Sequence, residues 1–224
     1  MRVGTKSVLF GAHSFILHPI FVFLAYWQLY GFPWDPRLCL ACVAHDLGYF
    51  GMDLVEGARS EEHVELGGRI MDRLCGRRWG DFVRRHSRSW CELHDHPYSR
   101  LCIADKLAFV ITPAWLYLPM ARASGELGEY IAAADGRRSD GKFSEAERRL
   151  LQSGNRKLWL KGLKSYTRRW VEAHRTGQCE GCDVDTGIVK KLMSERPLAG
   201  SSAAIPQAKR RANLIQSCRF NERC

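Results

Sequence analysis

The sequence predicts an all-α fold, and three observations support that prediction. Apolar side chains recur at helical spacing in several segments, whereas segments with the strict alternation of a strand are few. Clusters of glycine and proline separate these segments. Hydrophobic residues make up 46% and charged residues 26% of the 224 residues, a balance typical of a globular chain with a sizeable core. About six or seven helices are expected from this pattern.

Residues 8–30 form the most apolar stretch and are expected to build one central helix. Their side chains are apolar nearly all round, as in a helix that is buried on every side. His13, His18 and Gln28 interrupt the stretch, together with Pro19. Because titratable groups are costly in lipid, a buried core helix is favoured over a membrane span.

Turn-forming residues and capping signals place the helices that follow. Pro36 suits the first turn of a helix and comes after a turn that contains glycine and proline. Ser60, which two glutamates follow, is expected to cap another helix. The expected helices cover residues 37–47, 60–76, 79–90 and 98–118, with a loop at 48–59, a turn at 93–97 and a kink at Pro113.

The composition changes near residue 136, and this change suggests three parts. After a polar linker, residues 144–174 are expected to form one long amphipathic helix. The chain beyond residue 176 is polar, basic and rich in turn formers, so weak order is expected there. The predicted parts are a main domain at 1–135, a helical extension at 136–176 and a basic tail at 177–224.

All of the excess positive charge lies in the C-terminal part. Residues 1–136 carry 14 Lys and Arg against 15 Asp and Glu, whereas residues 137–224 carry 20 against 9. The net charge of +10 therefore divides into −1 and +11. Such a basic region favours contact with nucleic acid or another polyanion, and a solvated surface is the plainer interpretation.

The cysteines favour a reducing compartment. There are nine of them, an odd and scattered set, which fits free thiols better than a disulfide framework. A secretory signal is not recognisable, so a cytoplasmic protein is expected. Cys39-x-x-Cys42 lies within a predicted buried helix and is expected to pack in the core. Cys179-x-x-Cys182 has a spacing that suits a structural zinc site, although no clear second pair follows.

Four polar residues stand where apolar core residues are expected: His18, His45, Asp46 and Asp105. A buried carboxylate needs a partner, because an isolated charge in a core is very costly. Imidazole nitrogen together with carboxylate oxygen is a ligand set for divalent metals. The expected cofactor is one or two ions of Mn, Fe, Co, Ni, Zn or Mg.

Two further histidines, His63 and His86, could complete a second metal site in which Asp46 bridges two ions. Alternatively the site holds a single metal, and the two histidines line the pocket, where they bind phosphate or donate a proton. His13 competes with His18 for the first ligand position. His18 is favoured, and His13 is then a partner that orients a ligand.

The order in which six candidate ligands follow one another along the chain resembles that of the metal ligands in the HD superfamily of metal-dependent phosphohydrolases. These six residues are His18, His45, Asp46, His63, His86 and Asp105. The segment 18–25 resembles the first helix of that family, in which a ligating His opens an apolar run. Ala44–Gly48 resembles the signature His-Asp pair followed by an apolar residue and Gly. The likeness covers residues 7–130 and extends to small bacterial proteins of the HD type.

The resemblance implies an HD-type helical bundle that hydrolyses a phosphate ester of a nucleotide or related metabolite by a metal-activated water. Asp46, His63 and His86 are the expected catalytic residues. Arg88 and Lys106 are candidates for binding the substrate phosphate, since cationic side chains recognise phosphate oxygens. Arg84 is a further candidate for the same role.

The sequence departs from the family at the signature. Tyr49 and Phe50 follow Gly48, where many HD phosphodiesterases of cyclic dinucleotides carry Lys, so such a substrate is disfavoured. Two alternative functions remain open. One is a di-iron oxygenase of the same fold, and the other is a nucleic-acid-binding protein that uses the basic region 137–224.

Overall fold

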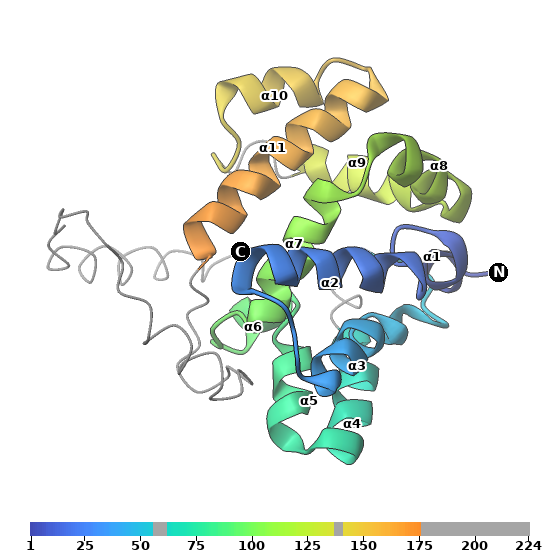
Figure 1. Cartoon of the computed structure of the whole chain (residues 1–224). Helices are drawn as coiled ribbons and strands as arrows, with labels where there is room; N and C mark the ends of the chain where they lie inside the picture. Colours follow the sequence, from blue (N-terminus) through green and yellow to red (C-terminus); the bar gives the residue numbers. More distant parts are fainter. Residues whose placement is uncertain (56–61, 137–140, 176–224) are drawn as a thin grey trace, which may run out of the picture. The chain divides into compact units, whose positions relative to one another are not determined.

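The computed structural model describes residues 1–55, 62–136 and 141–175 of the chain (Figure 1). These residues are mostly helical and include no strand, which confirms the all-α prediction. All of them belong to one compact unit. In chain order the helices are α1 (Val3–Phe10), α2 (Leu17–Tyr30), α3 (Pro36–Ala44), α4 (His63–Cys75), α5 (Arg77–Arg84), α6 (Arg88–Leu93), α7 (Arg100–Ile111), α8 (Ala114–Ser124), α9 (Glu126–Gly136), α10 (Glu145–Leu151) and α11 (Arg156–His174), with a short 3₁₀ turn, Leu47–Tyr49, between α3 and α4.

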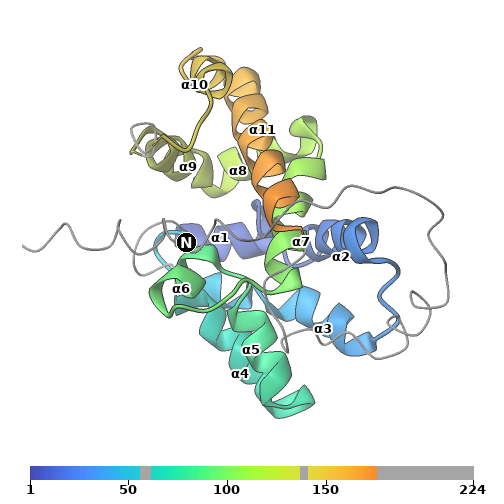
Figure 2. The same cartoon turned by 90° about the vertical axis from the view of Figure 1, so that its left-hand side faces the viewer.

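Helix α7 lies at the centre of the main core. It packs along α2 and against α11, while α4 packs against α3 and α5 (Figures 1 and 2). Residues 101–105 of α7 are all buried, which explains why this segment is apolar on every side apart from Asp105. The core between these helices is filled by side chains such as Val22, Met71, Phe82 and Ile103. Asp105 is thus carried on the most deeply buried helix.

The prediction of one helix over residues 8–30 is wrong. The chain forms α1 and α2 with a break between them. At the break, a Cβ on Gly11 would collide with the carboxylate of Glu126. The backbone N–H of Ala12 donates to Glu126 Oε2 over 2.8 Å. A tertiary contact therefore interrupts a segment whose own composition favours a continuous helix.

Two more predicted helices are each divided in the structure. Residues 79–90 contain the end of α5 and the start of α6, and Ser87 caps α6 by accepting a hydrogen bond from Trp90 N. Residues 98–118 contain α7 and the start of α8, which meet at an angle of 104° at Pro113. Proline cannot donate the backbone hydrogen bond that a continuous helix needs there, so the expected kink is a complete break.

The predicted helix over residues 144–174 is also two helices. Gly154 adopts a φ of 68°, which a glycine accepts readily. The side chain of Asn155 then accepts hydrogen bonds from Lys157 N and Leu158 N, and thereby begins α11. Helix α11 packs against α7 and α8. Its buried residues include Trp159, Leu160 and Val171.

Some expectations lie outside the described residues. They concern the cap at Ser60, part of the linker at 135–142, the Cys179 and Cys182 spacing and the basic tail at 177–224. Within the described chain, Cys39 is exposed, Cys42 is buried, and both are free thiols. No single helix of the described residues has the length and hydropathy to cross a membrane, and only the bent pair of α7 and α8 passes that test together.

Candidate metal centre

Six predicted ligands come from five separate elements of the fold. His18 is the second residue of α2, and Asp105 lies in the middle of α7. His45 and Asp46 follow the last residue of α3, and His63 is the first residue of α4. His86 lies in the turn between α5 and α6. All six side chains are buried.

The structure gathers these side chains into two groups that could each hold a metal ion. The first group contains His18, His45, Asp46 and Asp105, and the second contains Asp46, His63 and His86. Within each group the candidate ligand atoms all lie within 4.8 Å of one another. Asp46 belongs to both groups, so the two groups share one carboxylate.

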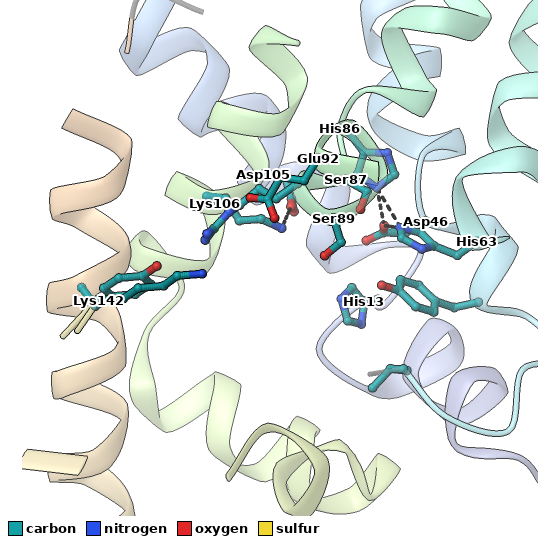
Figure 3. A pocket seen from close by; sticks show the side chains of 14 residues that line it. His13, Asp46, His63, His86, Ser87, Ser89, Glu92, Asp105, Lys106 and Lys142 are labelled. Atoms are coloured by element: carbon teal, nitrogen blue, oxygen red, sulfur yellow. Dashed lines mark hydrogen bonds and ion pairs between the residues drawn. The ribbon is translucent and has the colours of Figure 1, made fainter. Parts of the chain in front are cut away.

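The two oxygens of Asp46 face different histidines. Oδ2 lies 3.1 Å from Nε2 of His45 and 3.3 Å from Nε2 of His18. Oδ1 lies 3.2 Å from Nε2 of His86 and 3.9 Å from Nε2 of His63. Figure 3 shows Asp46 next to the rings of His63 and His86. This is the placement that a carboxylate bridging two ions requires.

The hydrogen bonds of the histidines test whether a cation fits here. His45 Nδ1 donates to the carbonyl of Cys42 over 2.8 Å, and His86 Nδ1 donates to the carbonyl of Val83 over 2.6 Å. An imidazole ring that carries its single proton on Nδ1 has a lone pair on Nε2. His45 Nε2 faces His18 Nε2 at 3.3 Å, and His86 Nε2 faces His63 Nε2 at 3.1 Å. Fixing Nδ1 on a carbonyl while Nε2 points inward is how proteins orient metal-ligating histidines.

The carboxylate of Asp46 supports the same conclusion. Its Oδ2 is buried and accepts no hydrogen bond from the described residues. A buried carboxylate oxygen without a donor is costly, and a metal ion would remove that cost. The donor set of four imidazoles and two carboxylates suits Zn, Fe, Mn, Co or Ni. The residues present therefore fit a divalent metal.

The charges of the cluster are strongly coupled. Burial opposes protonation of His18, but the hydrogen bond to Asp105 and the negative charge of Asp46 raise the pKa of its ring to about 10. Burial opposes ionisation of Asp46, but His45 and His13 hold the pKa of this carboxyl well below its usual range. Burial lowers the pKa of His45. Without a metal ion, the protonated ring of His18 thus supplies the positive charge between the carboxylates of Asp46 and Asp105.

A cavity of about 290 Å³ opens beside the cluster. Arg88 and Lys106, the candidates for binding the substrate phosphate, both line it. Lys106 Nζ lies 2.7 Å from Asp105 Oδ2, so this lysine is joined to the metal cluster (Figure 3). The guanidinium of Arg88 lies 4.6 Å above the ring of Trp170, and its Nε is buried without a partner among the described residues.

The structure does not bring the remaining candidates to the cavity. Arg84 makes ion pairs with Asp72 at 2.6 Å and Glu65 at 3.1 Å, and it does not line the cavity. His94 and His96 are exposed and stack on Trp90, in keeping with their interpretation as surface residues. Arg84 therefore has a structural role, because it joins α4 to α5.

His13, the competing ligand candidate, is placed beside the two groups but in neither. Its Nδ1 lies 2.9 Å from Glu126 Oε1, and its ring lies 5.7 Å from that of His18. Burial lowers the pKa of His13, but Asp46 and Glu126 outweigh it, so the net pKa is raised. The ring of His13 lines the cavity (Figure 3). The structure thus favours His18 as the ligand and gives His13 a place in the wall.

Several residues of the cavity could not be found from the sequence. Tyr49 stacks on His63 with ring centroids 4.1 Å apart. Lys142 and Tyr166, which belong to the C-terminal part, also line the cavity. Glu126 orients His13, although nothing in its local sequence distinguishes it from a surface acid.

Comparison with family models, with curated proteins and with solved structures gave no match for this chain.

Proposed function

We propose that this chain is a metal-dependent phosphohydrolase of the HD type that cleaves a phosphate ester of a nucleotide or related metabolite. The observation that carries the proposal is the sharing of Asp46 between two buried histidine groups. A divalent metal pair supplies an activated water and polarises a phosphoryl oxygen when bound. His18, His45 and Asp105 would hold one ion, His63 and His86 the other, and Asp46 both.

The side chains around the cluster fit a phosphate ester as the substrate. Arg88 and Lys106 place two cations on the wall of the cavity beside the ligands. A guanidinium binds two phosphate oxygens at once, while an ammonium acts as a point charge. Together these groups would hold the phosphate against the metal centre.

An isosteric variant tests the proposal directly. Asp46→Asn keeps the shape of the side chain but removes the shared charge. We expect it to lose bound metal, as measured by elemental analysis, and to release phosphate at least about a thousandfold more slowly, because the metal contributes several kcal/mol to the transition state. Nucleoside phosphates and simple phosphomonoesters serve as substrates.

Asp53→Asn is the matched control, because Asp53 is exposed and pairs with Arg2 away from the cluster. It is expected to keep both metal and activity. A folded Asp46→Asn protein that still hydrolyses these esters at the rate of the unmodified protein would refute the assignment.

Oxidation is the second candidate, because four histidines around a shared carboxylate also suit a pair of iron ions. The cations of the cavity favour phosphate over a neutral substrate. Protein purified without oxygen and loaded with iron distinguishes the two functions: oxygen uptake on addition of substrate supports oxidation, and phosphate release supports hydrolysis.

Nucleic-acid binding by the region 137–224 stays a prediction. Deletion of residues 177–224, followed by measurement of salt-dependent binding to DNA or RNA, would test it.

A further inference from the structure

A second cavity of about 230 Å³ adjoins the metal centre. Its wall includes His18 and Asp105 of the first metal group, so it reaches the cluster. It shares His13, Arg88 and Lys106 with the polar cavity described above. The two cavities thus meet at the metal ligands and at the proposed phosphate-binding residues.

Aromatic and apolar side chains from four helices form much of the remaining wall of this second cavity, together with Thr112 and Thr167. We call it the aromatic chamber, and its defining residues are Phe109 of α7, Tyr117 of α8, Tyr130 of α9, and Leu163 and Tyr166 of α11. Helices α9 and α11 lie outside the segment that carries the metal ligands. The C-terminal helix therefore takes part in the site itself.

The rings of the chamber are held in place by their neighbours. Phe109 and Tyr117 pack edge to face, with centroids 5.1 Å apart. The hydroxyl of Tyr130 donates to the buried carboxylate of Glu126 over 2.9 Å. The first contact joins two ring surfaces, whereas the second uses only the hydroxyl of Tyr130, and all three rings also line the cavity. Such surfaces bind flat rings in stacked or edge-to-face geometry.

Charge distinguishes the chamber from the polar cavity. The Lys and Arg side chains of its wall, Lys106 and Arg88, lie where the two cavities meet. The amino group of nearby Lys164 donates to the carbonyl of Thr112, and the nitrogen lies 5.7 Å from the centre of the Phe109 ring. The wall of the chamber includes no further Lys or Arg among the described residues, so it does not suit a chain of phosphates.

We propose that the aromatic chamber binds the organic group of the substrate, which is a compact, flat ring attached to a single phosphate. The inference rests on the proposed function, because the phosphate must lie at the metal centre for the ring to enter the chamber. The volume of the chamber, about 230 Å³, also limits the size of the ring, since pockets for drug-sized ligands measure about 300–1,000 Å³. A single ring system fits this space, and Leu163 and Tyr166 of α11 determine the specificity.

Binding of two uncleavable probes to the manganese-loaded protein tests the inference by calorimetry. Phenylphosphonate carries a flat ring and methylphosphonate does not, while both carry the same anion. We expect phenylphosphonate to bind at least about tenfold more tightly, which corresponds to burial of one aromatic ring. In Leu163→Trp, which fills the chamber, this preference should fall to about twofold or less, with the affinity for methylphosphonate unchanged.

Leu158→Trp is the matched control, because Leu158 lies on the same helix, is 40% exposed and does not line the chamber. It should keep the tenfold preference, and circular dichroism and metal content should show that both variants are folded. Equal binding of the two probes, binding of neither, or an unchanged preference in Leu163→Trp would overturn the inference. A phenyl preference without hydrolysis of phenyl phosphate would contradict the proposed function alone, whereas hydrolysis without the preference would contradict only the chamber.

Discussion

Each metal group depends on histidines that belong to it alone. His63 and His86 contact only the Oδ1 side of Asp46, whereas His18 and His45 contact the Oδ2 side. His63→Ala should therefore remove one ion and leave the other, so that elemental analysis of reconstituted protein falls from about two divalent ions per chain to one. His94→Ala, at an exposed histidine that stacks on Trp90, should keep both. Loss of both ions in His63→Ala with an intact fold would show that the two groups are not separate sites.

Glu126 should make the stability of the fold depend on pH. Its carboxylate is fully buried and accepts hydrogen bonds from Ser7, Ala12 N, His13, Ser124 and Tyr130. Burial raises its pKa, but these partners outweigh burial and lower the pKa to about 2.

Because the pKa is lower in the folded than in the unfolded chain, the contribution of Glu126 is complete above about pH 4.5 and is lost as the pH falls towards 2. Glu126→Gln should reduce the free energy of unfolding by about 3 kcal/mol at pH 7. Urea unfolding should show this difference shrinking below pH 4.5. A difference that stays constant from pH 7 to pH 3 would show that the carboxylate charge is not responsible.

His18, His45, Asp46 and Asp105 were predictable because each is a polar side chain in an apolar segment, whereas His63 and His86 stand among charged residues and lack this signal. Asp105 is the clearest case. The four residues that precede it in α7 are all buried, and each of them is apolar or a cysteine. Glu126 gave no such signal, because it stands between Gly125 and Leu127 at the start of a helix, where acids are common. Its role exists only through contact with residues more than a hundred positions away.

At the scale of the element, the contact between α3 and α4 holds His45 and Asp46 in place. Gly67 of α4 lies against the carbonyl of Ala44, and a Cβ at this position would collide with that backbone atom. Gly67→Ala should therefore push α4 away and reduce the stability by about 1–3 kcal/mol. Since the displaced backbone carries two ligands, the metal content should fall as well.

Gly128→Ala is the control for this substitution. Gly128 is also helical, but a Cβ there meets no atom within 4 Å. Alanine should stabilise that helix by about 0.5–1 kcal/mol, because it restricts the unfolded chain. Thermal unfolding compares the two variants, and equal midpoints would contradict the importance of the close approach at Gly67.

The ends of the helices were harder to predict than their existence. The break before α11 had a local signal, since Gly154 and Asn155 form a turn and a cap. The break between α1 and α2 had no equivalent signal, because the interruption at Gly11 depends on Glu126. The first of these two missed breaks could therefore have been predicted from its local sequence, whereas the second, which a distant side chain imposes, could not.

At the scale of the whole molecule, the metal centre joins elements from residue 18 to residue 105. Metal binding should therefore stabilise the entire fold, because the unfolded chain cannot bring these ligands together. At a hundredfold excess over the dissociation constant, one ion contributes about 2.7 kcal/mol. A chelator should lower the midpoint of thermal unfolding by roughly 5–10 °C, and added metal should restore it.

Asp46→Asn provides the control for this effect, because its unfolding midpoint should not respond to the chelator. A midpoint of thermal unfolding that is the same with and without chelator in the unmodified protein would contradict the link between metal and fold.

The aromatic chamber is also a feature of the whole molecule. It is formed by side chains between residues 12 and 167, so it could not be predicted from any single segment.

Anomalous diffraction from crystals soaked in manganese tests the central claim most directly, because it locates each ion. The shared carboxylate predicts two peaks about 3.5–4 Å apart, one beside His18, His45 and Asp105 and one beside His63 and His86, with Asp46 touching both. A soaked crystal with no manganese within bonding distance of Asp46 would contradict the account.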